Sequence, residues 1–170
     1  MTQSFISYLS LGSNIGDKLE NLQDAVNGID KNIGKVIAIS SIYETPAWGF
    51  KGDGFYNICL KIETSSQPNM LLEKVLELEK TLGRKRKETQ GYQDRNIDID
   101  IILFENKRIN TINLVIPHPR SLERKFVLIP LHDIYNEDTF PFNHQSLLKN
   151  IEQSIDKSEI KRTIFTIKKP

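Results

Sequence analysis

Cysteine is scarce in this chain, whose 170 residues include only Cys59. A single cysteine excludes a disulfide within the chain, and such sparing use is typical of a reducing compartment. No segment approaches the roughly 18 consecutive apolar residues that a membrane-spanning helix needs. Residues 1–5 also lack the basic segment followed by an apolar run that marks a secretory leader. We therefore expect a cytoplasmic protein without a membrane partner.

An excess of charge of one sign is missing as well. The chain carries 23 Lys and Arg residues against 22 Asp and Glu residues, which leaves a net charge of +1. Such a balance argues against general nucleic-acid binding, so we expect no nucleic-acid partner. The hydrophobic share of 38% is too high for a disordered chain, and 170 residues suit one domain with one core. The chain has no internal repeat and no low-complexity segment.

Apolar patterns along the chain predict an ordered series of strands and helices. Compact or alternating apolar segments predict strands at 5–11, 36–44, 55–64 and 95–104. Apolar residues at helical spacing predict helices at about 17–30 and 68–82. Farther on, we expect a helix that begins near Ser121 and another around 147–151, while residues 156–170 are either a strand or loose chain.

The order strand, helix, strand, strand, helix, strand is the split βαβ pattern. It predicts an α+β fold of the ferredoxin-like class, a sandwich in which helices pack mainly on one face of an antiparallel sheet. The other face of the sheet is then expected to be free for ligands. The helices and tail beyond this pattern form a C-terminal extension.

Two carboxylates, Asp98 and Asp100, stand at alternate positions of the otherwise apolar strand 95–104. Because side chains alternate between the faces of a strand, both should share one face, with Cα atoms about 6.6 Å apart. Ile97, Ile99, Ile101 and Leu103 should then enter the core from the other face. Like charges so placed repel unless a cation lies between them, and Mg²⁺ bound to nucleotide phosphates suits two such carboxylates. The alternative is a solvated strand face.

Cations gather on both sides of this strand. Arg-Lys-Arg-Lys at 84–87 and Arg95 precede the aspartates, whereas His118, Arg120 and Arg124 follow them. Guanidinium groups bind phosphate oxygens with two parallel hydrogen bonds, so we expect a phosphate site; a solvated basic loop is the alternative. The segment 45–54 joins two strands with three glycines and two large aromatics. That composition indicates a lid or ligand wall, or else a surface loop fixed by Trp48.

Six blocks of sequence, in the same order, resemble the 6-hydroxymethyl-7,8-dihydropterin pyrophosphokinase family of folate biosynthesis. They lie at 11–14, 43–46, 55–57, 82–86, 95–101 and 117–128. The resemblance implies a single catalytic domain over 1–170, with a core at about 4–135 and a C-terminal helix and tail at 136–170. It also implies transfer of diphosphate from ATP to the hydroxymethyl group of the reduced pterin, with release of AMP, by in-line displacement assisted by two Mg²⁺ ions. We expect a monomer.

The same resemblance assigns roles to particular residues. The two Mg²⁺ ions would be held by Asp98 and Asp100, and transfer would be assisted by Arg84 and Arg95. ATP would be contacted by Arg86, Tyr92, Ile101, His118 and Arg124. The pterin ring would lie between Phe55 and Phe126, with its polar edge bound by Asn57 and by the chain at Thr45, Pro46 and Trp48.

This chain departs from the family at a few of these positions. The family commonly has Gly-Pro before the arginine of the acidic strand, where this chain has Gln93-Asp94, and some members have tryptophan where Tyr92 stands. Leu76 occupies a position that is glutamine in some relatives, so no ATP contact is expected from it.

Two other functions fit parts of the pattern. A nucleotidyl cyclase or polymerase palm also places paired carboxylates on a ferredoxin-like sheet, but it releases pyrophosphate rather than AMP. A noncatalytic binding module for RNA or a metabolite is the second alternative, and RNA readers usually present a basic face. A carboxylate pair on the sheet would repel an RNA backbone in the absence of metal.

Overall fold

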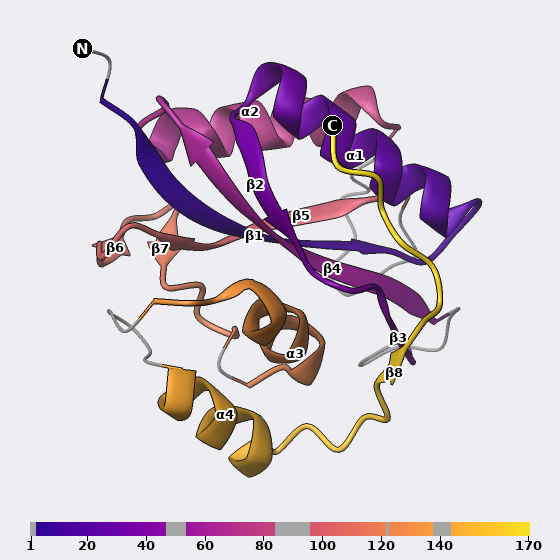
Figure 1. Cartoon of the computed structure of the whole chain (residues 1–170). Helices are drawn as coiled ribbons and strands as arrows, with labels where there is room; N and C mark the ends of the chain where they lie inside the picture. Colours follow the sequence, from indigo (N-terminus) through magenta and orange to yellow (C-terminus); the bar gives the residue numbers. More distant parts are fainter. Residues whose placement is uncertain (1–2, 47–53, 84–95, 122, 138–143) are drawn as a thin grey trace.

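The structure, a computed structural model, describes residues 3–46, 54–83, 96–121, 123–137 and 144–170. An antiparallel sheet runs between two layers of helices, with α1 and α2 on one face and α3 and α4 on the other (Figure 1). In chain order the elements are β1 (Phe5–Ser13), α1 (Lys18–Asn32), β2 (Lys35–Ile39), β3 (Tyr43–Thr45), β4 (Phe55–Thr64), α2 (Pro68–Thr81), β5 (Asp98–Phe104), β6 (Ile109–Asn110), β7 (Val115–Ile116), α3 (Lys125–Ile134), α4 (His144–Gln153) and β8 (Lys161–Arg162).

The strands of the main sheet are arranged in the order β5-β1-β4-β3-β8, and β2 also pairs with β4. All of these pairings are antiparallel. The predicted α+β class with a split βαβ core is confirmed, because β1 and β4 lie between β5 on one side and β2 and β3 on the other. No helix among the described residues is long and apolar enough to cross a membrane.

Alternation along the central strands builds the larger core. Leu9 and Leu11 of β1 and Ile58 and Leu60 of β4 are fully buried on the face that α1 and α2 cover. The helices contribute the apolar stripes that their spacing predicts, and Leu22 on α1 and Val75 on α2 are among the buried residues. Each fully buried aliphatic side chain contributes about 1.5–3 kcal/mol to folding. This layer therefore holds the central strands in register.

The opposite face of the sheet is not left free, so that expectation is wrong for part of it. Val127, Leu128 and Leu131 of α3 pack with Tyr8 and Cys59 in a second core on this face. The Cys59 Sγ lies 3.6 Å from the carbonyl oxygen of Val127. The helix begins at Lys125 rather than near Ser121, because Ser121 closes a turn instead: its N–H and its hydroxyl both donate to the carbonyl of His118.

The alternation along β5 breaks near its end. Tyr8 pairs with Leu103 but Leu9 pairs with Ile101, so Ile102 is an extra residue that forms a β-bulge. As a result, Ile102 and Leu103 both join the core on the α3 side. The prediction that Leu103 shares a face with Ile101 is therefore wrong, whereas Ile97, Ile99 and Ile101 enter the α1–α2 core as predicted.

The predicted strand 36–44 is divided into β2 and β3. The division falls at Ser40, whose hydroxyl accepts a hydrogen bond from the N–H of Cys59 at 2.9 Å and so takes the place of a strand partner. The tail contains one short strand, β8, which pairs with β3. Residues 156–170 are therefore partly strand and partly loose chain, which were the two possibilities that the sequence left open.

We expect Leu131→Ala to lower the free energy of unfolding by about 2–5 kcal/mol, because it empties a fully buried position under the second face of the sheet. Urea denaturation would measure the change. Ile164→Ala, at a side chain that is 94% exposed, is the matched control and should change stability little. Equal effects of the two substitutions would contradict the placement of α3 on this face.

Candidate active site

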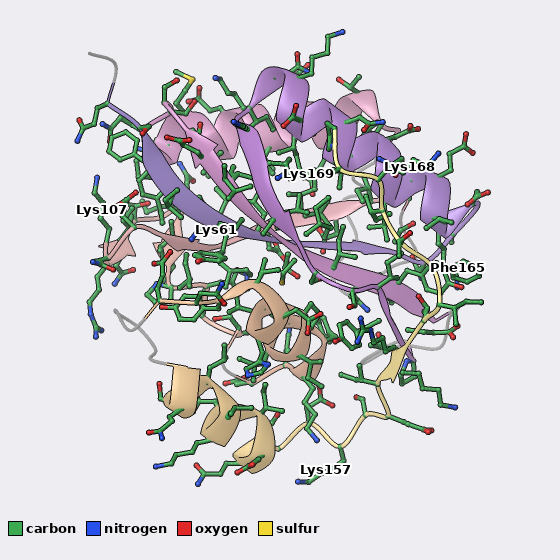
Figure 2. All side chains as sticks on the ribbon, viewed as in Figure 1. Lys61, Lys107, Lys157, Phe165, Lys168 and Lys169 are labelled. Carbon is green, nitrogen blue, oxygen red and sulfur yellow. The ribbon has the colours of Figure 1, made fainter. Side chains whose placement is uncertain are left out.

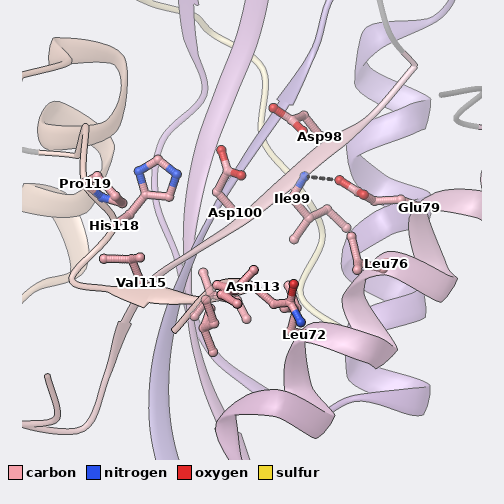
Figure 3. Close-up of a pocket in the computed structure, with 13 residues that line it drawn as sticks. Leu72, Leu76, Glu79, Asp98, Ile99, Asp100, Asn113, Val115, His118 and Pro119 are labelled. Atoms are coloured by element: carbon pink, nitrogen blue, oxygen red, sulfur yellow. Dashed lines mark hydrogen bonds between the residues drawn. The ribbon is translucent and has the colours of Figure 1, made fainter. Parts of the chain in front are cut away.

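The two aspartates of β5 lie on the same face of the sheet, as predicted. Asp98 pairs with Gly12, and Asp100 pairs with Ser10, two residues earlier on β1. Ile99, between them, is buried on the opposite face in the α1–α2 core. Figure 3 shows Asp98, Asp100 and the ring of His118 around one space beside β5.

A cavity of about 320 Å³ occupies this space. The structure brings four predicted site residues to its wall: Asp98, Asp100, Ile101 and His118. The remaining wall comes from α2 and from the chain around β7, including the apolar side chains of Leu72, Leu76, Ile112 and Leu114. A cavity lined by two carboxylates and by several apolar side chains can accept a flat heterocycle attached to a metal-bound polyphosphate.

Glu79 of α2 is a site residue that the sequence prediction missed. It is 1% exposed, and its Oε1 accepts a hydrogen bond from the backbone N–H of Ile99 at 2.8 Å (Figure 3). Because β5 ends the strand order of the sheet, this bond satisfies an N–H on its outer edge. Glu79 thus fixes the segment between the two aspartates. Its signal in the sequence was an acid four residues after Val75, within the apolar stripe of α2.

His118 is held at the cavity wall by its backbone, because its N–H donates to the carbonyl of Ile102 at 3.0 Å. Burial lowers the pKa of His118, and the nearby Asp98 carboxylate opposes that shift. The ring Nδ1 accepts from the N–H of Arg120 at 3.3 Å, which places the proton of a neutral ring on Nε2. A neutral His118 can therefore donate one hydrogen bond to a ligand.

A second group of predicted residues lies on β4 and β3, which are separated by β1 from the β5 cavity. Asn57 of β4 pairs with Gly12, and its Nδ2 donates to the hydroxyl of Thr45 at 2.9 Å. A Cβ on Gly12 would lie 3.1 Å from the Asn57 Oδ1 and 3.4 Å from the ring of Phe55. Glycine at this position lets Asn57 and Phe55 pack close to the backbone of β1, because a Cβ would press on both side chains. Pro46, the residue after Thr45, is exposed.

The start of α3 supplies two further predicted residues. The guanidinium carbon of Arg124 lies 5.5 Å from the ring centroid of Phe126. Burial lowers the pKa of Arg124, and the Asp156 carboxylate opposes that shift. The other predicted site residues, Trp48, Arg84, Arg86, Tyr92 and Arg95, lie outside the described residues.

The described residues contain no group of three His, Cys, Asp or Glu side chains that could hold a metal ion. The pair Asp98 and Asp100 nevertheless suits Mg²⁺, because that ion is usually bound by one or two carboxylates and completes its shell with phosphate and water oxygens. The cavity in front of the two side chains leaves room for such ligands. The residues present thus fit magnesium bound together with a phosphate-bearing substrate.

Comparison with known proteins agrees with this chemistry. A family model described as 7,8-dihydro-6-hydroxymethylpterin-pyrophosphokinase (HPPK) matches residues 8–136. The 2-amino-4-hydroxy-6-hydroxymethyldihydropteridine pyrophosphokinase of Aquifex aeolicus is 38% identical over 151 residues, which cover 84% of this chain and 92% of that protein. The folic acid synthesis protein fol1 of Pneumocystis carinii is 39% identical over 150 residues, or 88% of this chain, but only 20% of its own length is matched.

Solved structures show the same fold. Wild-type HPPK-DHPS of Plasmodium falciparum matches with a TM-score of 0.70 at 17% sequence identity, over 95% of this chain and 48% of that chain. The fold and the acidic cavity define an α+β enzyme domain suited to phosphate chemistry. Within that class, the chain belongs to the 7,8-dihydro-6-hydroxymethylpterin-pyrophosphokinase family, whose members are ATP-dependent pyrophosphokinases of folate biosynthesis.

We expect the imidazole of His118 to titrate below the ordinary histidine pKa of about 6.5, because burial disfavours its charged form. The unfolded chain then binds this proton more readily than the folded chain, so the contribution to stability is lost as the pH falls below about 6.5. NMR titration would measure the pKa, with His118→Gln to assign the resonance. The same variant should lose less unfolding free energy than the wild type between pH 7 and pH 5. A pKa at or above 6.5 would contradict the burial of the ring.

Proposed function

We propose that this protein transfers diphosphate from ATP to the hydroxymethyl group of 6-hydroxymethyl-7,8-dihydropterin and releases AMP. The observation that carries the proposal is the register across three strands, in which Gly12 pairs with Asp98 on one side and with Asn57 on the other. Adjacent strands lie about 4.8 Å apart, so the Cα atoms of Asp98 and Asn57 are about 10 Å apart. That separation suits a donor and an acceptor that meet above Gly12.

The donor nucleotide would occupy the cavity beside β5. Its base would lie against the apolar side chains of Leu72 and Leu114, and its phosphates would lie toward Asp98 and Asp100. His118 would donate a hydrogen bond from its Nε2–H to a phosphate oxygen. Arg124, like the residues expected at 84, 86, 92 and 95, would supply further hydrogen-bond donors to the nucleotide.

Asp98 and Asp100 would hold two magnesium ions. When bound, these ions would offset the negative charge of the phosphates. Without a cation, the two carboxylates would repel the triphosphate. The role of this pair is therefore to make the acidic end of the cavity accept phosphate only together with magnesium.

The acceptor would lie beside Asn57 and Phe55, above Gly12. Its ring would stack between Phe55 and Phe126, and Asn57, oriented by its bond to Thr45, would bind the polar edge. The hydroxymethyl oxygen would attack the β-phosphorus in line, and its proton would pass to solvent. The bond from that phosphorus to the oxygen shared with the α-phosphate would break, and AMP would leave with its electron pair. Alignment of this kind is the main contribution of proteins to phosphoryl transfer.

A chromatographic assay tests the reaction directly. The protein is incubated with ATP, Mg²⁺ and reduced 6-hydroxymethylpterin, and AMP and a diphosphorylated pterin should appear in equal amounts. Release of pyrophosphate without a pterin product would instead support cyclase or polymerase chemistry and would overturn the proposal.

We expect Asp98→Asn and Asp100→Asn each to lower kcat by about 100-fold or more, because metal ions contribute several kcal/mol to the stabilisation of transition-state charge. Both side chains lie on a face away from the main core, so circular dichroism should show an unchanged fold. Asp24→Asn, on the exposed side of α1, is the control and should retain activity. Nearly normal turnover in both active-site variants would exclude a metal-binding role.

We expect Gly12→Ala to weaken pterin binding by about 10-fold or more, because its Cβ would press against the Asn57 Oδ1 and the Phe55 ring and displace both side chains. Binding of ATP, which uses the cavity on the other side of β1, should change much less. Calorimetric titration with each substrate separates the two effects. Unchanged pterin affinity would place the acceptor elsewhere on the protein.

A further inference from the structure

Residues 154–170 form a strap that joins separate parts of the fold. After α4 the chain passes the start of α3, pairs as β8 with the edge of β3, and ends beside α1 (Figure 1). Figure 2 shows Lys157 near α4, and Phe165, Lys168 and Lys169 farther along this path. The strap lies beyond residues 8–136, which the family model matches.

At its first anchor, the strap caps α3. Asp156 is 2% exposed, and its Oδ2 accepts a hydrogen bond from the N–H of Lys125, the first residue of the helix, at 3.0 Å. The residue at the usual capping position, Arg124, makes no capping bond with its own side chain. A carboxylate at a helix N-terminus satisfies backbone N–H groups that have no partner within the helix and interacts favourably with the helix dipole. Asp156 supplies this cap from 31 residues away.

The chain around Asp156 keeps its carboxylate in place. The N–H of Ser158 donates to its Oδ1 at 2.8 Å, and the Ser158 hydroxyl donates to the same oxygen. The hydroxyl of Ser154 donates to the carbonyl of Glu123 at 2.9 Å, which ties the strap to the turn before α3. A buried carboxylate without such bonds would be strongly unfavourable. This anchor therefore has one well-defined geometry.

At its second anchor, the strap covers the open edge of β3. Arg162 pairs with Tyr43, and the N–H of Thr163 donates to the carbonyl of Ile42 at 2.9 Å. The ring of Phe165 then lies 6.1 Å from the ring of Tyr56 on β4. Strand β3 ends at Thr45, whose hydroxyl orients Asn57. Pairing along an edge strand restricts its motion and protects it from other partners.

The two anchors hold opposite sides of the acceptor site, since α3 carries Phe126 and β3 carries Thr45. We propose that the strap positions both sides of this site, and that Asp156 is a positioning residue for Arg124 and Phe126. The inference deepens the proposed function and rests on it, because these residues are expected to contact the substrates. The strap itself bonds to backbone groups next to them, the N–H of Lys125 and the carbonyl of Ile42.

The first test replaces the capping group in the full-length protein. Asp156→Ala should raise amide hydrogen exchange at 124–127 and weaken binding of 6-hydroxymethylpterin, each by about 10-fold, because the helix loses its cap. Asp156→Asn keeps an oxygen acceptor and should restore both properties to within about 3-fold of the wild type. Glu159→Ala, at an exposed side chain of the same segment that pairs with Lys161, is the control and should change neither.

The second test breaks the other anchor. Thr163→Pro removes the N–H that bonds to Ile42, whereas Thr163→Ala keeps it. The proline variant should raise exchange at 43–45 and weaken pterin binding by about 10-fold, and the alanine variant should do neither. If Asp156→Ala fails to fold, this pair of variants still tests whether the strap positions the site.

Pterin binding is measured by calorimetry in the presence of Mg²⁺ and α,β-methylene-ATP, which cannot be cleaved at the reacting bond. Wild-type pterin affinity in both Asp156→Ala and Thr163→Pro would overturn the positioning role. Equal loss in Asp156→Ala and Asp156→Asn would also overturn it, since the cap would then not be the cause. Failure of the wild type to make a diphosphorylated pterin would overturn the proposed function instead, and the exchange measurements would still decide whether the strap orders 43–45 and 124–127.

Discussion

The register of three antiparallel strands is the constraint on which the rest of the site depends. A shift of one residue between β1 and either neighbour would turn Asp98 or Asn57 to the opposite face of the sheet. Such a shift would also turn the buried partners of Leu9 and Leu11 on that neighbour away from the core under α1 and α2. The apolar burial that stabilises the fold thus also fixes the distance between the acidic cavity and Asn57.

Two buried acids extend this control beyond the sheet. Glu79 bonds to the backbone N–H of Ile99 between the aspartates, and Asp156 bonds to the N–H of Lys125 at the start of α3. Each bonds to the backbone of an element that carries site residues. Burial of a carboxyl group is costly unless hydrogen bonds compensate, and a bond to a backbone N–H supplies part of that compensation. The same bonds restrain the backbone from which the site side chains project.

Much of this arrangement is predictable from local sequence patterns, because side-chain periods of 2 and 3.6 residues identify strands and helices. The shared face of Asp98 and Asp100 follows from alternation alone. The bulge at Ile102 does not, because an extra residue is defined by the partner strand and not by the strand itself. Nor does the position of α3, since an apolar helix face does not reveal which side of the sheet it will cover. Asp156 bonds to a partner 31 residues away, so no local pattern identifies it. The acid within the apolar stripe of α2 marks Glu79 as unusual, but it does not reveal the partner 20 residues away.

The second core, between the sheet and α3, has a practical consequence for chemical labelling. Cys59 is fully buried there, and this burial raises the pKa of its thiol. Because the thiolate is the reactive form, the natural sulfur will resist alkylation and oxidation in the folded protein. A cysteine introduced on the surface would then be the single reactive position. Fluorophores or spin labels could be attached there without first removing the native residue.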